Sequence, residues 1–222
     1  MKPGTMRVLL LVVVGGWLAA CQSNTGSSES GAGKPLTSES GPQTLTKEWH
    51  ETPIPFFISE TVSSDLVQPI LDSFTAWEQK AGRKLFDYQG RVKSTAHEFD
   101  TKNVVYWDTN PSPKGYLGET YFMTYDGGEM VEADIVFFGD PKKFSTLDCQ
   151  NSASRCVSSS GKYDITTTAL HEIGHLLGFD HVATDGAIMN PNFGLNSVNH
   201  GFDSPLLTAL QDLYNPPTIA AK

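Results

Sequence analysis

Residues 171–181 read HEIGHLLGFDH, and this stretch decides the fold and the chemistry expected of the chain. In a helix, residues four apart lie on one face, so His171 and His175 can present ring nitrogens to one cation. Glu172 lies beside the first histidine and can reach a water at the metal without binding the metal. Gly178 lets the chain turn out of the helix, which brings His181 round as a third donor. Three imidazoles leave a fourth tetrahedral position open, as in catalytic zinc sites.

The helix that carries these residues is expected to begin at Asp164 or Ile165 and to stop at Gly178. Taken singly, each histidine reads as an ordinary surface or packed imidazole. The three at this spacing, with Glu172 beside the first, predict one catalytic zinc ion held by His171, His175 and His181.

This pattern resembles the longer zinc signature of the metzincin clan of metalloendopeptidases. Members of that clan have a tight turn with a methionine beneath the zinc, and Met189, within AIMNP at 187–191, matches it. Within the clan the chain is most similar to the matrixins, the matrix-metalloproteinase family, strongly over 168–191 and loosely over the rest of 49–217.

The resemblance implies an α+β fold, that of a metzincin-like catalytic domain. Such a domain has a mixed twisted sheet, an active-site helix and a C-terminal helix. The implied activity is zinc-dependent hydrolysis of peptide bonds in protein or peptide substrates, with Glu172 as general base and then acid. An edge strand within residues 117–138 is expected to align the substrate. The loop 192–203 is expected to form part of the specificity pocket.

Several departures from the matrixin pattern limit this comparison. The chain has no spare cysteine to cap the zinc, and the positions that correspond to ligands of a structural zinc are Glu119 and Ile135, so no second zinc is predicted. Asn190 follows the methionine where some other metzincins have a tyrosine. Matrixins also bind calcium, and the candidate donors are Asp126, Glu129, Asp134 and Asp140. These carboxylates read equally well as surface residues. The remaining histidines, His50, His97 and His200, lack a partner at ligand spacing.

The rest of the domain alternates short strands with helices. Apolar spacing predicts a helix through 65–77 that Gly82 closes, and a last helix from Ser204, as its cap, to about Tyr214. Strands are expected at 53–58, 85–88, 103–107, 119–124 and 133–138. This order favours an α+β domain with a mixed sheet over 48–217, followed by a tail at 218–222.

Cys149 and Cys156 lie seven positions apart in a loop rich in serine and asparagine. In an exported protein such a pair is expected to form a disulfide. The alternative is a pair of free thiols that bind a metal, but no neighbouring cysteine or histidine completes such a site.

The N-terminal region has the pattern of an export signal. A basic start and a short apolar run over 1–20 end in small residues before Cys21, which resembles the lipobox of bacterial lipoproteins. Cys21 is then the expected lipidation site, and 21–47, rich in serine and glycine, a disordered tether. The alternative is an ordinary signal peptide. We expect a cell-envelope lipoprotein held to the membrane by its lipid, with the outer membrane favoured, or a secreted protein.

The net charge of −9 argues against nucleic acid as a partner, because phosphate backbones select basic surfaces. We expect a monomer. Two other functions compete with the peptidase: a lipid-tethered binding protein that keeps the zinc fold, and a hydrolase of non-peptide amides. Glu172 and the open metal position argue against the binding protein, whereas the motif alone does not separate the two hydrolases.

Overall fold

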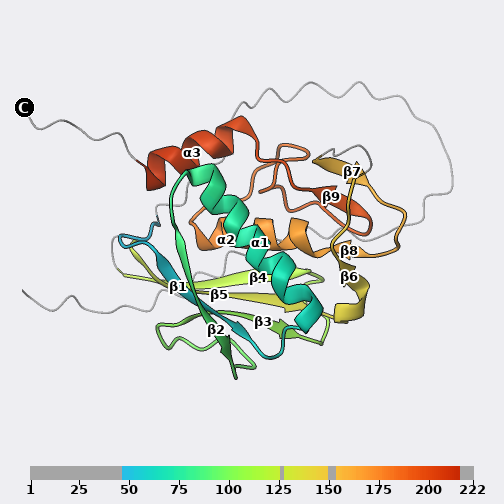
Figure 1. Ribbon diagram of the computed structural model, residues 1–222, viewed down its shortest axis with the longest axis horizontal. Helices are drawn as coiled ribbons and strands as arrows, with labels where there is room; N and C mark the ends of the chain where they lie inside the picture. The colour runs from blue at the N-terminus through green and yellow to red at the C-terminus, as the bar shows by residue number, and fades with distance from the viewer. Residues whose placement is uncertain (1–46, 126–127, 150–153, 216–222) are drawn as a thin grey trace, which may run out of the picture.

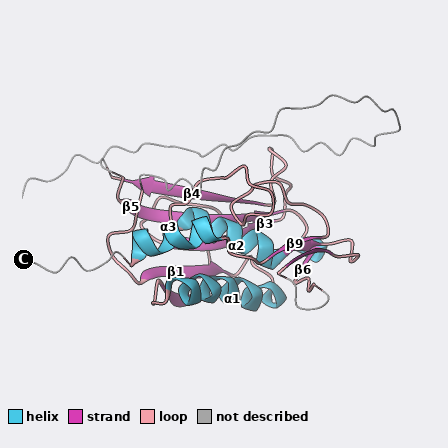
Figure 2. Ribbon diagram, turned by 90° about the horizontal axis from the view of Figure 1, so that it is seen from above, coloured by secondary structure: helices cyan, strands magenta, loops and turns pink. Residues whose placement is uncertain are grey.

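Five strands form one mixed sheet in the computed structural model, which describes residues 47–125, 128–149 and 154–215. Across the sheet they lie in the order β2 (Phe86–Val92), β1 (Ile54–Ser59), β3 (Asn103–Asp108), β5 (Met130–Phe138) and β4 (Gly118–Thr124). Neighbouring strands are parallel except β4, which is antiparallel to β5. The strand β4 therefore forms one edge of the sheet, at the margin opposite α1 (Ser64–Ala81) in Figure 2.

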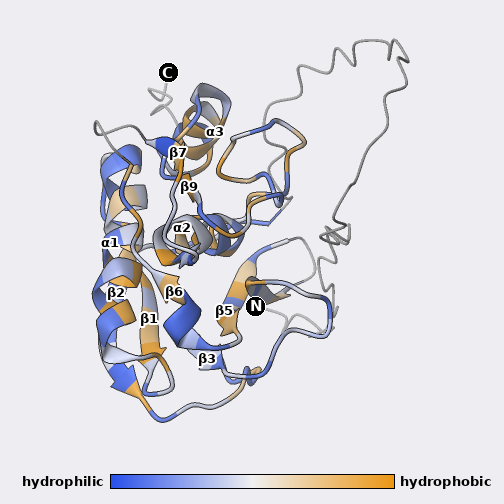
Figure 3. Ribbon diagram, turned by 90° about the vertical axis from the view of Figure 1, so that its right-hand side faces the viewer, coloured by the Kyte–Doolittle hydropathy of each residue, from blue (hydrophilic) through white to orange (hydrophobic). Residues whose placement is uncertain are grey.

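Two helices, α1 and α2 (Ile165–Leu176), cover the same face of the sheet (Figure 1). Both contribute to one apolar cluster that also includes the inward residues of the strands, such as Phe56, Ile135 and Phe137. Much of β1 and β5 is correspondingly hydrophobic in Figure 3. The opposite face of the sheet carries a smaller cluster around Val104, Tyr106, Val136 and Phe138. The helix α2 is buried along almost its whole length, and Glu172 in its metal motif contacts Thr120 of β4.

The helix α1 buries one stripe of side chains at helical spacing, namely Leu66, Ile70, Phe74 and Trp77. It ends at Gly82, whose φ of +70° is a left-handed conformation that glycine adopts at little cost. The indole of Trp77 is fully buried and donates a hydrogen bond of 3.0 Å to the carbonyl of Leu170. This bond fixes α1 against the helix that carries the metal motif.

Short elements build the second half of the domain. After the 3₁₀ helix η1 (Pro141–Lys143), β6 (Phe144–Ser145) pairs in parallel with β8 (Tyr163–Asp164), and β7 (Arg155–Val157) pairs antiparallel with β9 (Ser197–Asn199). A disulfide joins Cys149 to Cys156, with Cα atoms 5.6 Å apart. The helix α3 (Ser204–Tyr214) follows and packs against α1.

Most of the predicted elements are present, with three corrections. The strand expected at 85–88 extends to Val92, because polar side chains are tolerated on the outermost strand of the sheet. The helix with the metal motif ends at Leu176, and Gly178, with φ +96°, lies two residues beyond it. The cap of α3 is Asp203 rather than Ser204, since the Asp203 carboxylate accepts from the backbone N–H of Leu206.

Several predictions concern residues outside the described ranges. These are the signal peptide, Cys21, all but the last residue of the tether, Asp126, residues 216–217 of the domain and the tail at 218–222. Among the described helices, none combines the length and the apolar character that a membrane span needs.

Candidate active site

Three histidine rings converge between α2 and the loop that follows it. His171 and His175 lie one turn apart on α2, and the chain reverses after Gly178 to bring His181 beside them. Their Nε2 atoms are 3.2 Å apart between His171 and His175, 3.1 Å between His171 and His181, and 3.0 Å between His175 and His181. The described residues contain one group of three or more potential metal donors this close together, and it is this one.

Hydrogen bonds on the far side of the rings fix the protonation of two histidines. His171 Nδ1 lies 2.7 Å from the carbonyl oxygen of Ile188, and His175 Nδ1 lies 2.7 Å from that of Phe179. A carbonyl only accepts, so each Nδ1 carries the proton. Burial lowers the pKa of His171 to about 3 and that of His175 well below its usual value, so both rings are neutral. Each Nε2 therefore presents a lone pair.

Two lone pairs that face each other at 3.2 Å cannot hydrogen bond to one another. A cation between the rings satisfies both, and zinc bound at about 2.0–2.1 Å in a tetrahedron places its nitrogen ligands roughly 3.4 Å apart. The observed separations of 3.0–3.2 Å are close to that value. The donor set therefore fits a zinc ion held by three neutral imidazoles with one position open.

The carboxylate of Glu172 is held by the edge strand of the sheet. Thr120 Oγ1 lies 2.8 Å from Glu172 Oε2 and 3.1 Å from the Glu172 carbonyl, while a Cβ added to Gly118 would come within 2.8 Å of Glu172 Oε1. The absence of a side chain at Gly118 thus makes room for this carboxylate. Burial raises the pKa of Glu172 to about 8, and the hydrogen bond from Thr120 opposes that rise.

A turn containing Met189 lies beneath the histidines. The backbone N–H of Val182 donates to the Met189 carbonyl at 3.0 Å, and Met189 is fully buried against Gly174 of α2. A side-chain carbon at Gly174 would overlap the methionine sulfur. The Asn190 side chain bonds to backbone on both sides of it: its amide nitrogen donates to the Thr184 carbonyl, and its oxygen accepts from the backbone N–H of Asn192.

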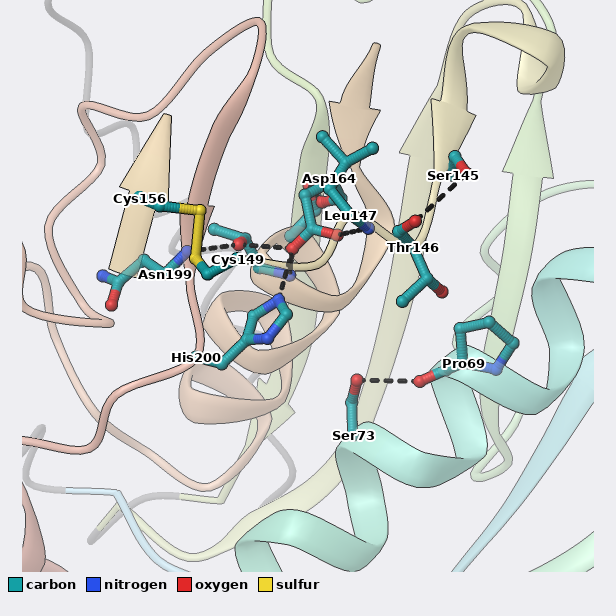
Figure 4. A network of polar contacts seen from close by, with 12 residues as sticks. Pro69, Ser73, Ser145, Thr146, Leu147, Cys149, Cys156, Asp164, Asn199 and His200 are labelled. Atoms are coloured by element: carbon teal, nitrogen blue, oxygen red, sulfur yellow. Dashed lines mark hydrogen bonds and ion pairs between the residues drawn. A yellow bond between two sulfur atoms is a disulfide. The ribbon is translucent and has the colours of Figure 1, made fainter. Parts of the chain in front are cut away.

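Asp164, the cap of α2, joins three separate segments through one buried carboxylate (Figure 4). Oδ1 accepts from the backbone N–H of Leu147 at 2.8 Å, and Oδ2 accepts from Thr167 N–H at 2.8 Å and from His200 Nε2 at 2.6 Å. Burial alone would raise the pKa of Asp164, but the hydrogen bonds from His200, Thr167 and Leu147 hold it below its usual value. The carboxylate thereby fixes the start of the metal-binding helix.

A pocket of about 190 Å³ lies beside the histidine cluster, bounded by β7, β9 and residues 186–193. Phe193 belongs to its wall, and the Phe193 ring packs edge-on against the ring of His171 with centroids 5.2 Å apart. Five residues of the loop 192–203, which was expected to form part of a specificity pocket, line it together with Arg155 and Cys156 of β7.

Three of the four candidate calcium donors are described, and each has an interaction partner within the protein. Asp134 is buried and accepts from the backbone of Val104, and burial raises its pKa to about 7. Asp140 accepts from the backbone of Lys142, and Glu129 lies 3.2 Å from His50. At the position of a structural-zinc ligand, Glu119 pairs with Lys114 at 2.7 Å and accepts from the Tyr121 hydroxyl.

Residue spacing did not identify Thr120, Gly118 or Asp164 as part of the site, and it classed His200 as an ordinary histidine. Thr120 meets Glu172 across 52 positions, and Asp164 meets His200 across 36. The one local signal was an acidic residue directly before a helix, which is a capping pattern.

Comparison with known proteins agrees with this geometry. Karilysin from Tannerella forsythia is 25% identical over 190 residues, which are 82% of this chain and 36% of karilysin. The chain thus spans about a third of the length of that relative. The family model described as matrixin matches residues 48–215, which include β1 through α3 and the whole histidine cluster. The chain belongs to the matrixin family of zinc metallopeptidases.

Proposed function

We propose that this protein is a zinc metalloendopeptidase in which His171, His175 and His181 hold the metal and Glu172 is the general base. The observation that carries the proposal is the convergence of the three Nε2 atoms, two of which are forced to present lone pairs to the same point. When bound, zinc supplies a Lewis acid that lowers the pKa of water and stabilises negative charge on the carbonyl oxygen.

Glu172 is placed to move the proton in this reaction. Thr120 occupies Oε2, which leaves Oε1 as the oxygen that accepts a proton from the attacking water. Glu172 then passes this proton to the nitrogen of the departing amine. Burial favours the protonated carboxyl, whereas the positive charge of a nearby cation favours the ionised form needed to start the reaction.

The strand β4 is suited to align the substrate. It pairs with β5 on one side, and among the described residues no strand pairs with its other side. An extended peptide can add to such an edge through backbone hydrogen bonds, which favours peptides over smaller amides. Because Thr120 and Gly118 belong to this strand, a peptide bound there passes directly beside Glu172.

The test compares the purified wild type with Glu172→Ala on an unfolded protein substrate, with zinc quantified in both. We expect the wild type to cleave, and the variant to lose at least about 100-fold in rate while it keeps about one zinc per chain. Normal activity in the variant would refute the role of Glu172. A full zinc site with no cleavage by the wild type would favour the binding-protein function.

We also propose that Cys21 carries a lipid that anchors a monomeric domain in the cell envelope, with the outer membrane favoured. The sequence pattern before Cys21 supports this. Metabolic labelling with a fatty acid, followed by membrane fractionation, tests it against Cys21→Ser. We expect labelled, membrane-bound wild type and an unlabelled variant. A wild type without label would leave an ordinary signal peptide as the explanation.

A further inference from the structure

Arg155 lies in the wall of the pocket beside the histidine cluster. Its Nε donates to the side-chain oxygen of Asn199 at 3.1 Å across the β7–β9 pair. A Cβ at Gly186 would lie 2.8 Å from Arg155 Nη1, and one at Gly201 would lie 3.3 Å from Nε. The exposed guanidinium therefore lies close to two glycines, although the nearest atom to a Cβ at Gly201 is Ser154 Oγ at 2.9 Å.

The charge of Arg155 is not balanced within the described part of the protein. None of the ion pairs between described residues involves Arg155. Asn199 engages Nε, and no described residue accepts from the two terminal nitrogens. This is notable in a chain with a net charge of −9, in which carboxylates outnumber cations.

The rest of the pocket suits a polar, negatively charged side chain of a substrate. Among the residues that line it, Arg155 is the one with a charge, and the others include Asn190, Asn192, Ser197 and Asn199. The two terminal nitrogens of a guanidinium match the two oxygens of a carboxylate. The pocket, at about 190 Å³, is large enough for the side chain of a glutamate.

The pocket also lies near His171, although none of the three histidines, Glu172 or the residues of β4 lines it. Phe193 is shared between its wall and the ring of His171. Two other lining residues, Ala187 and Asn190, flank the pair Ile188–Met189, and the Ile188 carbonyl accepts from His171 Nδ1, on the side of that ring away from the other two histidines. A side chain held here would belong to a substrate residue close to the cleaved bond.

We infer that Arg155 is a specificity-determining residue that selects substrates with a glutamate or aspartate close to the scissile bond. The inference rests on the proposed peptidase function and adds its substrate class. Arg155 lies within the loop that the disulfide between Cys149 and Cys156 closes, directly before Cys156, and this limits where its side chain can reach.

The test uses the zinc-loaded protein and quenched fluorescent peptides that differ at one residue. Glutamate, glutamine or lysine is placed in turn at each position around the cleaved bond, which mass spectrometry identifies. At one position we expect kcat/KM for glutamate to exceed that for glutamine by about tenfold, an advantage that falls as salt is added. Arg155→Gln should reduce this ratio to about one, and Arg155→Glu should favour lysine instead.

Two controls separate recognition from structure. Arg155→Lys keeps the charge and should retain part of the preference, whereas a purely structural loss would lower kcat/KM for all three peptides equally. Lys143→Gln removes an exposed charge from η1, outside the pocket, and should leave the ratio unchanged. If Arg155→Gln does not fold, the inference is tested by the glutamate-to-glutamine ratio of kcat/KM in Arg155→Lys and by the salt dependence of that ratio in the wild type.

An equal preference for glutamate in the wild type and in Arg155→Gln would overturn the inference. So would the lack of any position at which glutamate is preferred, provided that neutral peptides are cleaved. Failure to cleave every peptide, neutral ones included, would instead overturn the proposed function, and this inference with it.

Discussion

Replacement of Thr120 by valine removes one hydroxyl group and keeps the shape of the side chain. That hydroxyl lies 2.8 Å from Glu172 Oε2. Thr120 is 8% exposed and Glu172 is 4% exposed, so water has little access to replace the lost partner. A hydrogen bond to a charged group contributes about 1.5–3 kcal/mol, which corresponds to roughly 10- to 100-fold in rate if the ionised Glu172 is required.

Loss of the Thr120 hydroxyl should also shift the pH dependence of kcat/KM in a definite direction. Thr120 stabilises the ionised carboxylate and lowers the pKa of Glu172, so its removal should raise that pKa. The acidic limb of kcat/KM should therefore move to higher pH, by about one to two units for the energies above. At a pH well above the shifted limb, the loss of activity should shrink to the part that comes from poorer orientation of the carboxylate.

The assay is a pH profile of kcat/KM on one peptide, with zinc content measured for every variant. Thr120→Ser keeps the hydroxyl and should keep the acidic limb of the wild type, even if its packing is poorer. A Thr120→Val variant with full zinc, an unshifted acidic limb and normal kcat/KM would show that Thr120 does not support Glu172.

Two further predictions concern stability. Asp164→Ala should lower the free energy of unfolding by about 2–4 kcal/mol, because it removes a helix cap and leaves buried donors unpaired. The stability that ionised Asp164 contributes to the wild type should be present above about pH 4 and lost as pH falls through the lowered pKa of this carboxyl. The free energies of unfolding from urea titrations at pH 7 and pH 3 should therefore differ less in the variant than in the wild type. An equal difference in the two proteins would contradict this. Replacing Cys149 and Cys156 by serine should lower the free energy of unfolding by roughly 2–3 kcal/mol with zinc content unchanged, and loss of zinc would show that the disulfide-closed loop supports the metal site directly.

The sequence was most informative where function depends on residues within one or two helical turns. The spacing of His171 and His175 places both rings on one face of a helix, and Gly178 accounts for the reversal that brings in His181. Periodicity likewise located α1, which buries one regular stripe of apolar side chains, whereas β3 and β5 were found as apolar runs because both of their faces are buried.

The parts that could not be predicted depend on contacts between distant segments. Thr120 is a polar residue in a strand, and only the pairing of β4 beside α2 shows that it faces Glu172. His200 has no partner at ligand spacing in the sequence, and only the fold shows that its Nε2 contacts the carboxylate of Asp164. The strands β7 and β9 are three residues long, too short for alternation to stand out, so the pocket that contains Arg155 was also hidden.

The contact between Gly174 and Met189 bears on attempts to make the enzyme more robust. Glycine within a helix is normally a target for improvement, since alanine there gains about 1 kcal/mol. At Gly174 the methionine sulfur already fills the space, and Trp77 lies 3.2 Å from the same point. A side chain at Gly174 would displace Met189 or Trp77. Replacing Gly174 to raise the thermal stability of this domain would therefore displace Met189, which lies beneath the metal-binding histidines.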